Sequence, residues 1–172
     1  MIALYSLLVV ALSALLAACG KAPSHNATNA DADGAHATTP AALGTQVVLP
    51  TDDYLELPQY RDADRERGER LVMQCRACHS FDQDGRNIIG PNLHGFFGRR
   101  VASVAGYSYS PALRNANFIW TPQALDAWLA QPADFLPGNW MVYGGLNAPE
   151  DRNAAVAALL RLTADEPEVP RR

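Results

Sequence analysis

Two cysteines followed directly by a histidine carry the most specific chemistry in this sequence. The run reads Cys75-Arg-Ala-Cys78-His79. Cysteines three positions apart fall on one face of a helical turn, so both thiols can form thioethers with the two vinyl groups of one porphyrin. The adjacent imidazole can then bind the iron. The motif predicts one covalent haem c, attached through Cys75 and Cys78, with His79 as the fifth iron ligand.

Two other uses of this motif fit the rest of the chain poorly. A zinc site would need two more ligands at a second close pair, and the only other cysteine is Cys19, far upstream. A thioredoxin-like redox pair occurs in a βαβ setting, whereas the pattern around this motif is helical. We therefore favour haem attachment over both alternatives.

The sixth iron ligand can be narrowed by considering the three methionines. Met1 belongs to a segment that we expect to be removed. Met73 lies two residues before the first haem cysteine, so it cannot reach the opposite face of the haem. Met141 remains, and a thioether is a common axial ligand in cytochromes. The alternatives are a gap-filling role for Met141 in the core and ligation by His94, which we expect instead to hold a loop through hydrogen bonds.

Helical patterns with irregular connections must position these residues. A first helix is predicted over residues 62–75, with acidic residues at its start and one apolar face. Thr121 and Pro122 are typical of an N-cap and first helical position, and this second helix should stop at Gln131-Pro132. Residues 147–150 have capping-box spacing and should open a last helix. Residues 81–120 show no alternating run long enough for a strand, so the loops should wrap around a large cofactor.

The N-terminal residues predict export and attachment to a membrane. Residues 2–18 are apolar and uncharged, which is typical of a secretory signal peptide, although an uncleaved anchor helix is the alternative. The stretch ends in Leu16-Ala-Ala-Cys19, which resembles a bacterial lipobox, so Cys19 is expected to carry lipid. Residues 19–50 have few large apolar side chains and are predicted to form a flexible linker. The remaining domain would span residues 51–172, with its core at about 61–164.

The charge of the chain argues against nucleic acid as a partner. Fourteen basic and 18 acidic side chains give a net charge of −4, and the excess acidity lies in the segments that flank the core domain. The one lysine of the chain is Lys21, in the expected linker. We also expect no small-molecule substrate.

Further motifs occur in order along residues 61–164 and together resemble class I cytochrome c, the mitochondrial and bacterial c2-like type. The haem motif is followed by Gly90–Arg99, Gly106–Tyr109, Phe118–Thr121 and Pro137–Met141. The resemblance implies an all-α fold in which helices and long loops wrap around one covalently bound haem. It also implies an electron-transfer protein rather than an enzyme.

The resemblance assigns roles to residues outside the haem motif. Pro91 would accept a hydrogen bond from the second nitrogen of His79 and so orient the ring. Trp128 stands where the family commonly has a tyrosine near the methionine sulfur, and Gly68 would let the first and last helices cross closely. Three side chains would neutralise or hydrogen-bond the haem propionates: Arg99, Tyr109 and Trp120.

Three departures from the family limit what can be carried over. Asn139 replaces a threonine of the methionine loop, and Ala158 replaces an aromatic residue of the last helix. The family docks its partners through lysines around the haem edge, and the core domain has none. Trp140, beside the expected ligand, is either an exposed docking contact or a residue packed on the haem.

These observations predict a mono-haem c-type cytochrome that carries single electrons while tethered to the periplasmic side of a bacterial membrane. Its partners would be a quinol-oxidising donor complex and a terminal oxidase or reductase in a respiratory chain. The linker would let the domain move between them. Two alternatives remain: a haem enzyme or sensor whose open sixth site handles peroxide or a diatomic gas, and a fixed electron-entry subunit of a larger respiratory complex.

Overall fold

Short helices joined by long loops make up the computed structural model, which describes residues 39–164. In chain order the elements are η1 (Pro40–Leu43), α1 (Thr51–Leu55), α2 (Pro58–Arg61), α3 (Arg65–Val72), η2 (Cys75–Ala77), α4 (Pro111–Asn115), α5 (Pro122–Ala130), α6 (Pro132–Phe135) and α7 (Pro149–Thr163). Extended pairing among these residues is limited to an isolated antiparallel bridge between Arg100 and Ile119. The all-α fold is therefore confirmed. The predicted signal segment and Cys19 lie outside the described residues.

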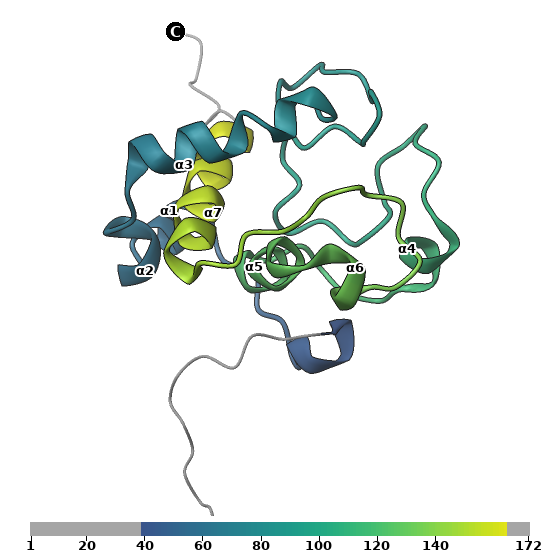
Figure 1. Cartoon of the computed structure of the whole chain (residues 1–172), viewed down its shortest axis with the longest axis horizontal. Coiled ribbons are helices and arrows are strands. Elements are labelled where there is room, and N and C mark those ends of the chain that lie inside the picture. Colours follow the sequence, from purple (N-terminus) through teal and green to yellow (C-terminus); the bar gives the residue numbers. More distant parts are fainter. Residues whose placement is uncertain (1–38, 165–172) are drawn as a thin grey trace, which may run out of the picture. The chain divides into compact units, whose positions relative to one another are not determined.

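Helix α3 crosses α7 closely, as Figure 1 shows. The crossing depends on Gly68, because a Cβ at this position would lie closer than 3.0 Å to the carbonyl oxygen of Ala154 and 3.2 Å from the Cβ of Ala158. A small residue at position 158 thus fits the close approach. The predicted first helix was too long: α3 ends at Val72, and Cys75 opens the separate short helix η2, which Cys78 follows as the C-cap residue.

Helix α5 begins and ends as its sequence predicts. The hydroxyl of Thr121 accepts a hydrogen bond from the N–H of Ala124 at 3.2 Å, and Pro122 occupies the first helical position. The capping-box prediction for the last helix was wrong. Helix α7 has Ala148 as its N-cap, without a side-chain cap, and starts at Pro149. The fixed φ of proline is sufficient to start the helix at this point.

Residues 40–49 are packed on the domain, so this part of the linker prediction was wrong. Leu43 of η1 is buried in the hydrophobic core. The Gln46 amide donates to the carbonyl oxygen of Ile119 at 2.6 Å, and its oxygen accepts from the N–H of the same residue at 2.8 Å. The Tyr54 hydroxyl bonds to the backbone of Val47 and Leu49. Composition alone misses such contacts, because a few specific side chains hold the segment.

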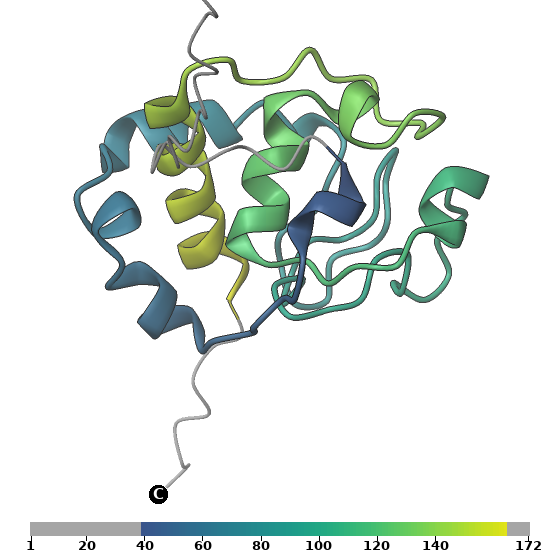
Figure 2. The ribbon, with the colours of Figure 1, turned by 90° about the horizontal axis from the view of Figure 1, so that it is seen from below.

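The loops that follow η2 form the part of the domain away from α3 and α7. Figures 1 and 2 both show α5 between α7 on one side and α4 on the other, with the loops of residues 81–110 extending past α5. Aromatic side chains fill the space beside α5 through edge-to-face contacts, such as Trp120 with Trp128 at 5.6 Å between ring centroids. Within residues 39–164, no helix is long and apolar enough to cross a membrane.

Candidate haem site

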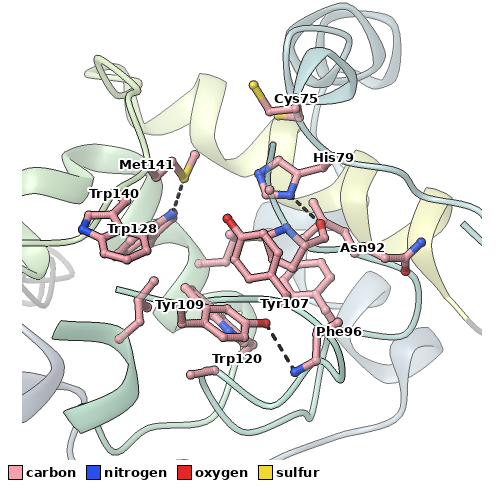
Figure 3. Close-up of a pocket in the computed structure, with 18 of the residues that line it drawn as sticks. Cys75, His79, Asn92, Phe96, Tyr107, Tyr109, Trp120, Trp128, Trp140 and Met141 are labelled. Carbon is pink, nitrogen blue, oxygen red and sulfur yellow. Dashed lines mark hydrogen bonds between the residues drawn. The ribbon is translucent and has the colours of Figure 1, made fainter. Parts of the chain in front are cut away.

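A cavity of about 410 Å³ lies among η2, α5 and the long loops (Figure 3). Its lining is largely apolar and aromatic, which suits a large planar cofactor. His94, the rival iron ligand, does not line it. Every residue that was predicted to attach, bind or contact the haem does line it: Cys75, Cys78, His79, Pro91, Arg99, Tyr109, Trp120, Trp128 and Met141.

His79 is held in one orientation by its surroundings. Its Nδ1 donates to the carbonyl oxygen of Pro91 at 2.7 Å, which is the hydrogen bond that the family resemblance implied. The bond places the proton on Nδ1 and leaves the lone pair of Nε2 for a metal. Burial lowers the pKa of His79, partly opposed by the bond to Pro91, so the ring is neutral at pH 7. Gly90 is required beside it, because a Cβ there would overlap the imidazole.

The two haem cysteines do not form a disulfide with each other, and both are partly buried. Burial raises the pKa of Cys75 to about 11, so its thiol is protonated at neutral pH. A redox-active cysteine pair requires a lowered pKa, because the thiolate is the reactive form. Within residues 39–164, no group of three or more His, Cys, Asp or Glu side chains is placed to hold a metal ion. Neither the redox pair nor the zinc site therefore gains support.

Met141 is positioned by two neighbours. The indole N–H of Trp128 donates to its sulfur at 3.1 Å, and its backbone N–H donates to the side-chain oxygen of Asn139 at 2.8 Å. The Asn139 amide in turn donates to the carbonyl oxygens of Pro132 and Leu136. Figure 3 shows Met141 and His79 facing each other across the cavity. The asparagine that replaces the family's threonine thus holds the methionine loop through backbone contacts.

Replacing Trp128 with phenylalanine should lower the reduction potential of the haem-loaded protein. An N–H donated to the thioether withdraws electron density from sulfur, so its removal makes sulfur a better donor to ferric iron. One hydrogen bond of about 0.5–1.5 kcal/mol corresponds to a fall of at most about 60 mV for a one-electron couple. Potentiometric titration of Trp128→Phe and the unmodified protein measures this. An equal potential in the variant would show that the bond does not tune the iron, and a higher one would contradict the predicted direction.

The cationic groups of the cavity lining come from one loop. Arg99 and Arg100 are the charged side chains among its lining residues, and Arg99 also donates through Nε to the carbonyl oxygen of Gly95 at 2.7 Å. Tyr109 is buried, and burial raises the pKa of its hydroxyl, so that group is a neutral donor at pH 7. Anionic substituents of a cofactor would find their hydrogen-bond donors on this side.

Sequence reasoning missed a buried arginine that anchors the methionine loop. Arg152 of α7 is 2% exposed, and its Nε donates to Asp126 of α5 at 2.8 Å. Its Nη1 donates to the carbonyl oxygens of Leu146 and Asn147 at 2.9 and 2.8 Å. Position 152 shares its helix face with the apolar positions 155, 156 and 159, so this spacing could have identified it as buried.

Cavity, ligands and fold agree on one class of cofactor. The imidazole nitrogen and thioether sulfur lie on facing sides of an apolar cavity, with two thiols beside the imidazole. These donors fit a haem attached through thioethers and bound by histidine and methionine. Fold and site together define a c-type haem protein.

Comparison with known proteins identifies the family. No family model matches the chain. The cytochrome c of Cochliobolus lunatus is 39% identical over 101 residues, which are 58% of this chain and 94% of that protein. The cytochrome c of Arabidopsis thaliana is 40% identical over 97 residues, 56% and 87% of the two chains. A cytochrome c homolog of Rickettsia felis is 38% identical over 91 residues, 53% and 52% of the two chains.

The chain therefore belongs to the cytochrome c family. Its cofactor is one covalently bound haem c with histidine and methionine as iron ligands, and it is a haem electron carrier that reacts with redox proteins.

Proposed function

We propose that this protein is a one-electron carrier tethered to the periplasmic side of a bacterial membrane, within a respiratory chain. The observation that carries the proposal is the placement of Met141, held by Trp128 and Asn139 opposite His79. The bound haem supplies a ferric/ferrous couple. A site whose two axial side chains are already held in place needs little rearrangement when one electron enters or leaves, and little rearrangement favours fast transfer.

The residues around the haem would orient the histidine ligand, raise the reduction potential and hold the propionates. Pro91 keeps the proton of His79 on Nδ1, so Nε2 stays available as a donor. The apolar lining excludes water and disfavours the additional positive charge of ferric iron, which raises the potential, as does a thioether ligand. Arg99, Tyr109 and Trp120 would hold the propionates, which would otherwise be costly charges in a buried site.

The visible spectrum of the purified, haem-loaded protein tests this function against an enzyme or sensor with an open sixth site. We expect a low-spin ferric spectrum with a far-red charge-transfer band from sulfur to iron. A high-spin ferric spectrum would contradict the carrier and favour the enzyme or sensor. Isolation of the protein only within a stable respiratory complex would instead favour a fixed electron-entry subunit.

We propose that the anchor is a lipid on Cys19. The proposal is supported by the apolar, uncharged residues 2–18 and by Leu16-Ala-Ala-Cys19 at their end. The remaining residues up to about 39 would form the tether. It would keep the domain at high effective concentration near membrane-bound partners.

The Cys19→Ser protein should remain unprocessed and should not incorporate labelled palmitate in bacterial cells. Ser24→Ala, a nearby change outside the lipobox, is the matched control and should behave like the unmodified protein. Gel mobility, palmitate labelling and membrane fractionation measure the effect. A Cys19→Ser protein that is still cut at the normal site and still bound to membranes would refute lipidation.

The electron donor would be a quinol-oxidising complex, and the acceptor a terminal oxidase or reductase. Export to the periplasmic side would place the carrier in the compartment where such complexes exchange electrons with small cytochromes. The relatives named above support redox proteins as partners in general.

A further inference from the structure

Five large apolar side chains are exposed at lining positions of the cavity or directly beside them in the sequence, and we call them the apolar rim: Met73, Ile88, Ile89, Trp140 and Val142. Trp140 is 61% exposed and Val142 fully exposed, and both line the cavity together with Ile89. Met73 and Ile88 do not line it, but each directly precedes a residue that does. The rim therefore combines residues from three separate segments of the chain.

One hydrogen bond joins two of the segments that carry the rim, and another ties the third segment to a neighbouring loop. The amide of Gln74 donates to the hydroxyl of Tyr143 at 3.1 Å, which links the residue after Met73 to the residue after Val142. The hydroxyl of Tyr107 donates to the carbonyl oxygen of Ile89 at 2.8 Å. The first bond therefore holds the Met73 and Val142 segments together, and the second holds Ile89 against the loop of Tyr107, which also lines the cavity.

The loops that line the cavity carry almost no charge. Residues 87–98, 101–113 and 135–149 contain no aspartate, glutamate, lysine or arginine. Arg99 and Arg100, between the first two of these loops, are the charged residues of the cavity lining. Lysine is absent from the whole described part of the chain. The segment 69–86, which carries Met73 and precedes Ile88, has charges of both signs in equal number: Glu69, Asp82 and Asp84 against Arg70, Arg76 and Arg86. The rim thus has no excess of positive charge with which to attract an acidic partner.

We propose that the apolar rim docks a redox protein whose own contact face is apolar and nearly uncharged. The proposal rests on the carrier function above and names the kind of surface that its partner presents. A partner with a charged contact face would lose hydration on binding without gaining an opposite charge from these loops. Apolar side chains clustered on a surface are typical of protein interfaces. Docking here places the partner at the opening of the haem cavity.

This surface predicts a particular dependence on salt. Charged docking surfaces accelerate association through long-range attraction, which salt screens. An uncharged rim lacks this attraction and relies on burial of apolar area, so the reaction with its partner should depend only weakly on ionic strength. Trp140 would be the main contact, because large aromatic side chains commonly dominate interface energies.

The test compares two double variants of the full-length, haem-loaded protein. The rim variant Met73→Glu/Ile88→Glu adds charge at exposed rim positions that do not line the cavity. The control Val47→Glu/Val48→Glu adds the same charge at exposed apolar positions of another segment, outside the cavity lining. Reduced protein is mixed with membranes from the source cells, and haem oxidation is followed optically. For comparison, the oxidised form of each protein is reduced by a neutral hydroquinone, a small molecule that needs no docking surface.

We expect the rim variant to be oxidised by the membranes at least about ten-fold more slowly than the unmodified protein, and the control variant to be nearly unaffected. All three proteins should share one spectrum and one rate with hydroquinone. The rate of the unmodified protein with membranes should change by less than about three-fold between about 20 and 300 mM salt.

Several results would overturn the docking proposal. A steep loss of rate with salt would show charge-based docking, and an unimpaired rim variant would show that the rim makes no contact. Sedimentation could reveal that the unmodified protein is a dimer and the rim variant a monomer. Flotation with phosphatidylcholine vesicles could reveal that the unmodified protein binds lipid and the rim variant does not. If the rim variant lost the dimer or the lipid contact but was oxidised by membranes at the normal rate, the rim would bind a second copy of the chain or a lipid surface instead of a redox protein. Membranes that exchange no electrons with the unmodified protein would refute the carrier function itself.

Discussion

The Met141→Ala protein should lose the far-red charge-transfer band completely and should have a lower reduction potential than the unmodified protein. Met141 is the methionine that lines the cavity, and its sulfur is held by Trp128. Alanine cannot reach the iron, so the ferric form should become high-spin or bind water. Loss of the thioether also removes a ligand that favours ferrous iron. Spectra of the ferric protein and a potentiometric titration measure both effects.

Met73→Ala is the matched control for this experiment. Met73 is 61% exposed and does not line the cavity, so its variant should keep the band and the potential. Loss of the band in Met73→Ala with its retention in Met141→Ala would exchange the roles of the two methionines. Retention in both would show that neither sulfur binds the iron.

The Arg152→Met protein should be less stable than the unmodified protein by about 3–5 kcal/mol, because breaking a buried ion pair leaves an uncompensated charge. The Arg152 side chain is 3% exposed and the Asp126 side chain 17%. The variant takes the guanidinium away from this carboxylate and from the carbonyl oxygens of Leu146 and Asn147. Equilibrium unfolding of the ferric protein in urea measures the loss.

A second readout separates a local role of Arg152 from general destabilisation. The loop that Arg152 anchors begins with the segment that carries Met141, so the charge-transfer band should also weaken below the unfolding transition. Arg67→Met is the control on the facing helix. Arg67 pairs with Asp151 at the surface, where ion pairs contribute little, so its variant should keep stability and band. Equal losses of stability in the two variants would contradict the proposed anchor.

Residue types and spacing were sufficient to predict the haem site. Two cysteines and a histidine in a fixed spacing fit the vinyl groups and iron of one porphyrin, and Met141 followed by elimination among three methionines. The family resemblance then named the other residues that line the same cavity. This worked because attachment and ligation need particular atoms that few side chains possess.

Composition was a poorer guide to which residues pack on the domain. Residues 40–49 were assigned to a flexible linker together with the preceding segment, which has almost no large apolar side chain before Leu43. In the structure, one buried leucine and the paired hydrogen bonds of Gln46 with Ile119 hold them. The partner of Gln46 lies 73 positions away, so no local pattern reports the contact.

The sequence by itself determined the cofactor, its attachment points, the axial ligands and the helical class, because these depend on chemical identity and short-range spacing. Only the tertiary structure decided that Arg152 anchors the methionine loop and that an apolar rim surrounds the cavity opening. Both features join residues far apart in the chain. The helix face of position 152 indicates burial from sequence alone, but the partners of Arg152 and the exposure of an isoleucine can be assigned only when the neighbouring segments are in place.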